Sequence, residues 1–228
     1  MLGLRAAYGD VLVLRDVTLI AAGGSLTVLA GENGSGKSTL LGAIAGTVRI
    51  LAGSVRTGEE LLSGLTPPEI ARRGVTRVLQ RPRLVPSLSV VDNVVLGRLP
   101  RRGENAAVAL CRWEWASEER ASRHHALETL EHLGIASLAD RPAGRLSAGQ
   151  VKLVAFARAR LHGGPIFLFD ELLSGVAVEE RRRLVAALAC LAQEGAVVLS
   201  VEHEPTDLLN AGGVALRLRD GMVCEDRL

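Results

Sequence analysis

A loop with the spacing of a phosphate-binding turn covers residues 31–39, where the sequence reads Gly-Glu-Asn-Gly-Ser-Gly-Lys-Ser-Thr. Its glycines let the backbone turn tightly and aim N–H groups at an anion, which side chains with a Cβ would obstruct. Lys37 can reach the β- and γ-phosphates of a nucleotide, and Ser38 can offer its hydroxyl oxygen to Mg²⁺. We therefore expect ATP and Mg²⁺ to bind at Gly31, Glu32, Asn33, Gly34, Ser35, Gly36, Lys37, Ser38 and Thr39.

A pair of carboxylates follows the apolar run Ile166-Phe-Leu-Phe169. Such a run indicates a strand that is buried on both faces, and ligands of open α/β sheets bind where strands of this kind end. Asp170 is suited to holding Mg²⁺, usually through water, while Glu171 can orient and deprotonate an attacking water. The alternative is that the two acids only cap the next turn.

The elements that must position these groups alternate between strand and helix. Residues 25–30 indicate a buried strand before the loop and residues 39–45 a helix after it, which is the order that a phosphate loop requires. Residues 166–169, 178–193 and 196–201 indicate strand, helix and strand. This alternation favours a parallel sheet with crossover helices.

Other parts of the chain have different patterns. Residues 2–29 are rich in β-forming residues, a second short β segment is expected near residues 53–56, and residues 66–79 fit a short helix followed by a strand. Residues 82–160 turn helical and charged, with an amphipathic period over residues 117–133. We interpret this stretch as a helical insert.

Composition sets wider bounds on the kind of protein. The chain has 228 residues, 48% of them hydrophobic, with 27 Lys plus Arg against 25 Asp plus Glu, so its charge gives no reason to expect nucleic acid as a partner. The stretch Val17–Gly31 has no charged residue, but it is too short and too polar to span a membrane. The sequence also lacks the pattern of a secretory signal, and Cys111, Cys190 and Cys224 have no metal-binding or redox spacing.

The segment Leu146-Ser-Ala-Gly-Gln150 adds a signature to the loop and the acid pair. With it, the whole chain resembles the ATP-binding-cassette (ABC) ATPases, with Ala148 in place of a glycine as the departure within the segment. The resemblance implies that Ser147, Gly149 and Gln150 approach the nucleotide of an opposite subunit, so hydrolysis requires a head-to-tail pair. The structural alternative is that Ser147 is an ordinary helix N-cap.

Three further positions fit the same resemblance. Tyr8 corresponds to the aromatic that stacks on adenine, Gln80 to the glutamine that touches Mg²⁺ and the water, and His203 to the γ-phosphate sensor. Tyr8 could instead be a surface aromatic beside a turn, and His203 a solvated histidine between two glutamates. Because Gln80 stands where the expected strand gives way to the helical insert, it is a plausible coupling element.

The resemblance also implies the architecture. We expect an α/β fold with the parallel-sheet core of RecA-like P-loop NTPases, an N-terminal antiparallel β subdomain and an inserted α-helical signature subdomain. A single ABC ATPase domain spans 1–228, with residues 1–81 and 161–228 as the nucleotide-binding core and residues 82–160 as the helical subdomain. The implied partners are a second ABC ATPase subunit, identical or paralogous, and membrane permease subunits.

The stretch 81–94 looks like the segment by which importer ATPases contact a coupling helix of their permease, with an apolar patch at Leu84, Val85 and Leu88. Together with other short segments it is most similar to the branched-chain amino acid and urea importers. We therefore expect a cytoplasmic ATPase attached peripherally to the inner face of the membrane through its permease partners.

Two departures from the family pattern suggest another function. Leu172 stands where the family usually has proline, and Ala177 where it has an aspartate that bridges the two subunits. Hydrolysis is expected to be slower or less cooperative for this reason. The alternatives are a regulatory switch that binds ATP and hydrolyses it weakly, or an ABC ATPase without a transporter.

Overall fold

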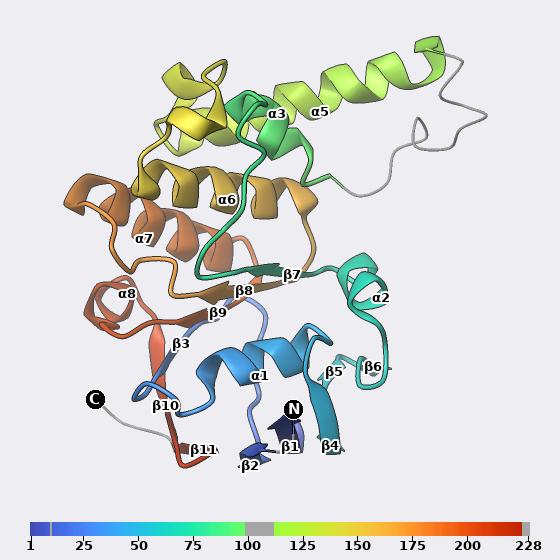
Figure 1. The fold of residues 1–228 in the computed structure, drawn as a ribbon, viewed down its shortest axis with the longest axis vertical. Coiled ribbons are helices and arrows are strands. Elements are labelled where there is room, and N and C mark those ends of the chain that lie inside the picture. The colour runs from blue at the N-terminus through green and yellow to red at the C-terminus, as the bar shows by residue number, and fades with distance from the viewer. Residues whose placement is uncertain (10, 99–111, 225–228) are drawn as a thin grey trace. The chain divides into compact units, whose positions relative to one another are not determined.

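The computed structural model describes residues 1–9, 11–98 and 112–224 (Figure 1), so Cys111 lies outside the described residues. By their internal contacts, two compact units divide the chain. The first comprises Met1–Gln80, Gly164–Ser174 and Val185–Leu228, and the second comprises Arg81–Gly163 and Gly175–Leu184. The first unit therefore gathers segments that are distant in the sequence, including the phosphate loop and the acid pair.

A nine-stranded sheet forms the framework of the first unit within the described part of the chain, in the order β4-β1-β2-β11-β10-β3-β9-β8-β7. A separate pair of short antiparallel strands, β5 and β6, follows β4. The strands are β1 Leu2–Tyr8, β2 Val11–Val17, β3 Leu26–Ala30, β4 Arg49–Ser54, β5 Arg56–Thr57, β6 Glu60–Leu61, β7 Val75–Val78, β8 Ile166–Asp170, β9 Val197–Val201, β10 Val214–Arg219 and β11 Met222–Cys224.

The sheet has a parallel part and an antiparallel part. Strands β10, β3, β9, β8 and β7 run parallel to one another, whereas β11 pairs with β10 in antiparallel fashion. Strands β3 and β8 are almost completely buried, which accounts for their apolar sequences. Strands β4, β1 and β2 pair in antiparallel fashion and join the rest through a single bridge between Asp16 of β2 and Met222 of β11. The predicted fold class, with its N-terminal antiparallel portion, is confirmed.

Helix α1, Lys37–Ile44, leaves the phosphate loop and contacts β1, β2 and β8 (Figure 1). Its residues Leu40 and Leu41 are fully buried in the apolar core that includes Leu14 and Leu168. Two shorter helices, α2 Pro67–Arg72 and α8 Thr206–Asn210, contact β7 and β3 respectively. Burial of α1 against the sheet fixes where the loop before it must lie.

The second unit is helical, as the charged and periodic sequence indicated. Its elements are α3 Val90–Val95, α5 Arg112–His132, the 3₁₀ turns η2 Ala136–Leu138 and η3 Ala143–Arg145, and α6 Ala148–His162. Helices α3, α5 and α6 pack against one another around buried apolar residues such as Val94, Leu130 and Phe156. Helix α7, Val178–Gln193, begins in the second unit and ends in the first.

None of the described helices is both long enough and apolar enough to cross a membrane.

Candidate active site

The phosphate loop connects β3 to α1, as predicted, and its glycines are required by their backbone angles and by close neighbours. Gly31, Gly34 and Gly36 all have positive φ, of 156°, 80° and 102°. A Cβ at position 31 would lie 2.5 Å from the Leu218 carbonyl oxygen, and one at position 36 would lie 2.9 Å from Cγ1 of Val13. Neighbouring atoms therefore exclude larger residues at positions 31 and 36, whereas Gly34 is needed because of its positive φ.

Lys37 begins α1 and its side chain is buried beneath the loop. Its Nζ donates hydrogen bonds of 2.7 Å to the carbonyl oxygens of Gly31 and Glu32. Burial lowers the pKa of Lys37, while the carboxylates of Glu171 and Asp170 act in the opposite direction. The ammonium group thus lies within the electrostatic reach of both the predicted base, Glu171, and the predicted magnesium ligand, Asp170.

A pocket of 780 Å³ opens beside the loop, a volume suited to a nucleotide. It is lined by the first half of the loop, by β2, by the end of β10 and by His203. The hydroxyl of Ser35 is buried there, and no described residue forms a hydrogen bond with it, so the loop retains a donor for an anion. Tyr8 does not line this pocket: its side chain is 72% exposed, although it pairs across the hairpin with Val11, which does.

Two of the three predicted magnesium ligands, Ser38 and Asp170, come together from positions far apart in the chain, while the third, Gln80, bonds to Glu171. The Ser38 hydroxyl donates to Oδ1 of Asp170 over 2.9 Å, and the other oxygen of Asp170, Oδ2, accepts a 2.9 Å bond from Nη2 of Arg77. Two protein oxygens are a sufficient set for Mg²⁺, which keeps most of its waters and takes the rest of its ligands from phosphate. Among the described residues, no cluster of three or more His, Cys, Asp or Glu side chains forms a closed metal cage.

Glu171 follows Asp170 and has an unusual backbone, with φ of 50°. The Gln80 side-chain amide donates to Oε2 of Glu171, and Nε2 of His203 lies 3.1 Å from Oε1. The structure therefore brings two of the predicted catalytic side chains, Gln80 and His203, into contact with the third, Glu171. A non-glycine residue at positive φ is strained, and such strain occurs often at active sites.

The signature segment lies in the second unit, at the start of α6. Ser147 is the N-cap of this helix: its hydroxyl accepts from the Gln150 N–H over 3.2 Å, and the Gln150 side chain accepts from the Ser147 N–H over 3.1 Å. The capping alternative is thus correct, yet the hydroxyl proton of the exposed Ser147 is still available to an outside acceptor. Gly149 is buried, since a Cβ there would lie 3.3 Å from side-chain atoms of Glu180 and Val176.

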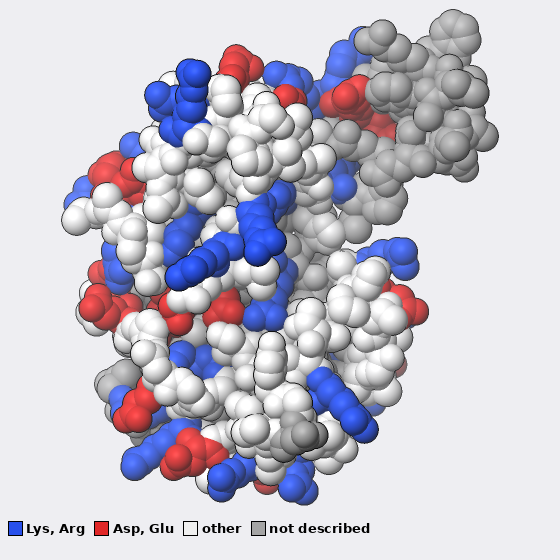
Figure 2. Space-filling model, viewed as in Figure 1, with Lys and Arg blue, Asp and Glu red and all other residues white. Residues whose placement is uncertain are grey.

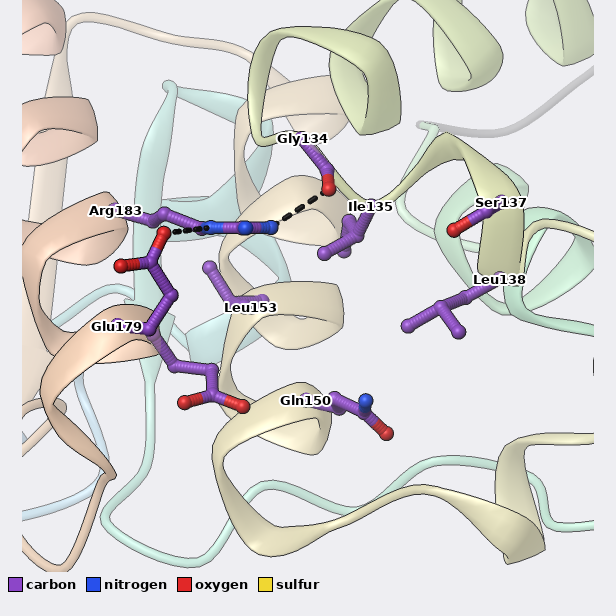
Figure 3. A pocket seen from close by; sticks show the side chains of 9 residues that line it. Gly134, Ile135, Ser137, Leu138, Gln150, Leu153, Glu179 and Arg183 are labelled. Carbon is purple, nitrogen blue, oxygen red and sulfur yellow. Dashed lines mark hydrogen bonds and ion pairs between the residues drawn. The ribbon is translucent and has the colours of Figure 1, made fainter.

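Beyond Gln150, a pocket of 270 Å³ separates the start of α6 from the turn that ends α5 (Figure 3). The Arg183 guanidinium donates to the Gly134 carbonyl oxygen over 2.6 Å and to Glu179 over 3.2 Å, which fixes one wall. These contacts join the first part of α7 to the turn after α5, within the second unit.

Comparison with known proteins decides the family. The sequence model described as "ABC transporter" matches residues 14–174, which is most of the chain. The chain belongs to the ABC transporter family. Its phosphate loop, acid pair and signature are therefore the parts of an ATP-binding cassette, and ATP with Mg²⁺ is the ligand of this family.

Two relatives of this cassette are named as ATP-binding proteins of transport or import. A probable branched-chain amino acid transport ATP-binding protein from Methanocaldococcus jannaschii, LivG, is 30% identical over 203 residues, which is 89% of this chain and 79% of the relative. A ribose import ATP-binding protein from Streptomyces avermitilis, RbsA 2, is 31% identical over 218 residues. That match covers 96% of this chain, which spans only 41% of the ribose relative.

A solved cassette structure agrees with the fold. The dimeric post-hydrolysis state of the ATP-binding cassette MJ0796 bound to ADP and Pi superimposes with a TM-score of 0.79 at 26% identity, covering 97% of this chain and 94% of that one. The predicted resemblance to ABC ATPases is thereby confirmed for both sequence and fold. The roles of the individual site residues in this cassette remain predictions.

The two departures from the family pattern have different surroundings in this cassette. Leu172 is buried, and the N–H of the next residue, Leu173, donates to the Glu202 carboxylate over 3.1 Å. Ala177 is exposed just before α7 and offers no side-chain cap to that helix. The turn after Glu171 is therefore held by apolar burial and by Glu202, while the side chain of Ala177 contributes no polar contact.

Sequence reasoning missed two residues of the site, Arg77 and Glu202. Arg77 is a charged residue inside a short strand expected to be buried, which is a signal that it needs an ionic partner. Glu202 is only 2% exposed and also accepts from the Ser200 hydroxyl, but in the sequence it looks like one of two ordinary glutamates beside His203. Nothing in the local pattern distinguished it from Glu204.

Proposed function

We propose that this chain binds and hydrolyses ATP as the nucleotide-binding subunit of an importer, working on the inner face of a membrane beside permease subunits. The observation that carries the proposal is the meeting of Ser38, Asp170 and Glu171 next to a nucleotide-sized pocket. The importer relatives support the transport role. The test is whether the purified chain turns over Mg·ATP.

The chemistry follows from what each side chain can do. Glu171 is placed to accept a proton from water, and Gln80 and His203 hold its two carboxylate oxygens. Lys37 and the loop N–H groups oppose the charge that develops on the phosphates. Mg²⁺, when bound at Ser38 and Asp170, would neutralise phosphate charge. No covalent intermediate on the protein is needed.

Pairing of two cassettes is part of the proposal. Ser147 is exposed at the N-terminus of α6, where backbone N–H groups and a hydroxyl suit a phosphate held by another subunit. The dimeric ADP and Pi complex of MJ0796 supports the same arrangement for this chain. ATP would then drive closure of the pair, and phosphate release would let it reopen.

The Ser147→Arg variant should bind ATP but fail to pair. A bulky cation at this position removes the hydroxyl and the cap of α6 and blocks the close approach of a second subunit. Subunit mass in the presence of ATP, measured by light scattering, is expected to stay at that of one chain. Ser147→Thr is the control, because it keeps both hydroxyl and cap. If Ser147→Arg formed an ATP-dependent dimer, the signature segment would not have the proposed role in pairing two cassettes.

We further propose that residues 81–90 meet the permease. Their backbone runs beside residues 141–145, since the Gly144 N–H donates to Pro86 and the Val90 N–H to the Arg141 carbonyl oxygen. Four exposed arginines, Arg81, Arg83, Arg141 and Arg145, belong to these two stretches. In the described part of the chain none of the four forms an ion pair with a carboxylate. Figure 2 shows Lys and Arg side chains gathered over this region.

The predicted apolar patch of Leu84, Val85 and Leu88 belongs to the first of these two stretches. A permease segment that presents acidic residues beside an apolar helix face would match both features. The double variant Arg83→Glu with Arg145→Glu should therefore lose copurification with the permease while keeping ATP affinity. Arg120→Glu, on the exposed face of α5, is the matched control. Retention of the permease by the double variant would contradict this docking surface.

The solute is proposed only as a class. The LivG relative supports branched-chain amino acids or a similar small polar solute, whereas the ribose relative shows that the same cassette sequence pattern serves another cargo. The cassette would contact the permease and not the solute. The residues of the cassette therefore do not identify which solute is transported. Solute uptake by the reconstituted transporter is the deciding measurement.

A second candidate function is a switch that closes on ATP and scarcely hydrolyses it. The observation that favours it is the missing polar contact at Ala177. The turnover assay on the wild-type chain separates the two functions: steady release of phosphate supports the motor, and ATP-dependent pairing without phosphate release supports the switch. A paralogous partner that carries the missing aspartate could restore turnover.

A further inference from the structure

Arg77 is a buried cation at the edge of the sheet. It lies on β7, which is the last strand of the sheet and pairs with β8 in parallel, with Arg77 opposite Leu168. Its side chain is only 15% exposed, and that of its partner Asp170 is 6% exposed. A buried charge is costly unless it is paired, so the Arg77 guanidinium depends on its partner Asp170.

The guanidinium of Arg77 reaches three elements at once. Nη2 donates to Oδ2 of Asp170 over 2.9 Å and lies 3.3 Å from the Ser38 carbonyl oxygen, and Nη1 lies 3.3 Å from the Thr47 hydroxyl. A side chain at Gly42 would crowd this region, because its Cβ would fall 3.4 Å from Nη1 of Arg77. Arg77 therefore ties β7 to the end of β8, to the start of α1 and to the turn between α1 and β4.

These contacts select which oxygen of Asp170 faces the phosphate loop. With Oδ2 held by Arg77, Oδ1 is left to accept the Ser38 hydroxyl. Ser38 and Asp170 are two of the three predicted magnesium ligands, the third being Gln80, and Arg77 contacts the side chain of Asp170 and the backbone of Ser38. A partner of this kind orients a ligand without touching the metal itself.

We propose that Arg77 is a positioning residue for the magnesium site, which holds the Asp170 carboxylate in the orientation that receives Mg²⁺ beside Ser38. This inference rests on the proposed function, since it presumes that Mg²⁺ accompanies a nucleotide at this loop. It predicts that loss of Arg77 weakens the binding of Mg²⁺ and leaves the metal-free binding of nucleotide unchanged.

The opposite result is physically possible and makes the proposal testable. Arg77 carries a positive charge near the cation site, so its removal relieves a repulsion of Mg²⁺. Removal also leaves a buried carboxylate without its partner and free to turn away from Ser38. Because the guanidinium charge is neutralised by Asp170 itself, the orientation effect is expected to be the larger of the two.

The experiment uses a fluorescent, non-hydrolysable ATP analogue and the full chain. The analogue is first bound to an excess of protein in the presence of EDTA. Mg²⁺ is then titrated into this complex. For Arg77→Met the half-saturating Mg²⁺ concentration should rise about 10–100-fold, which is typical for loss of a partner of a metal ligand. Affinity for the analogue in EDTA should match the wild type, which a general loss of structure would not allow.

Matched variants separate positioning from stability. Arg73→Met removes an arginine that pairs with Glu60 on the surface, and it should leave the Mg²⁺ titration unchanged. Arg77→Lys keeps the charge but not the planar fork, so it should shift the titration in the same direction by less. If Arg77→Met does not fold, as judged by thermal unfolding, Arg77→Lys carries the test.

A folded Arg77 variant whose Mg²⁺ titration equals the wild-type titration, or shifts to lower concentrations, would overturn the role of Arg77 and leave the proposed function intact. If the wild-type chain bound no nucleotide under any condition, the proposed function and this inference would both be wrong. Binding by the wild type therefore distinguishes the two failures.

Discussion

Glu171→Gln is expected to bind ATP as the wild-type chain does, while its turnover falls about 10²–10⁴-fold, the usual cost of losing a general base. The amide keeps the size of the side chain and can still bond to Gln80 and His203, but it cannot accept the proton of an attacking water. Its neighbours Asp170 and Lys37 stay in place, so the phosphates should still be held. The variant therefore isolates the chemical step from binding.

Phosphate release and subunit mass, both measured in Mg·ATP, test this expectation. A variant that cannot hydrolyse ATP should accumulate as the ATP-bound dimer, whereas the wild type passes through that state and reopens. Glu59→Gln is the control, since Glu59 is exposed in the turn between β5 and β6. Equal turnover of Glu171→Gln and the wild type would show that another group acts as the base.

Lys37→Ala should weaken ATP binding about 10–100-fold, in line with the 1.5–3 kcal/mol that hydrogen bonds to charged groups contribute. The substitution removes the one ammonium group that lies within the loop and that is buried close to Asp170 and Glu171. It also removes the Lys37 donor from the carbonyl oxygens of Gly31 and Glu32, of which Glu32 keeps the bond from the Ser35 N–H. Both effects leave more negative charge facing the triphosphate.

Equilibrium titration with the fluorescent analogue measures this loss without hydrolysis. Arg56→Ala is a suitable control, because Arg56 contacts only the carbonyl oxygen of Glu59 among the described residues and lies on the surface. Lys37→Arg should recover part of the affinity, since it restores the charge in a bulkier form. Wild-type affinity of Lys37→Ala would count against the phosphate loop as the binding site.

The sequence alone determined the features that are local in the chain. The phosphate loop needs only contiguous residues, since three glycines, a lysine and a serine at set spacing produce both its backbone and its charges. Periodicity likewise predicted helix 178–193 with the bounds of α7, and the apolar run 166–169 predicted the strand that carries Asp170. Short-range sterics and burial decide these elements, and each leaves its pattern in one window of sequence.

Only the tertiary structure decided which distant side chains meet. Arg77 and Asp170 are 93 residues apart and Gln80 and Glu171 are 91 apart, and they meet because β7 and β8 are neighbours at one edge of the sheet. Glu202 reaches Leu173 because β9 lies next to β8. Strand order depends on which surfaces pack together over the whole unit, and no single stretch of sequence encodes it. Arg77 therefore looked like an isolated charge in the sequence and became part of the site only in the fold.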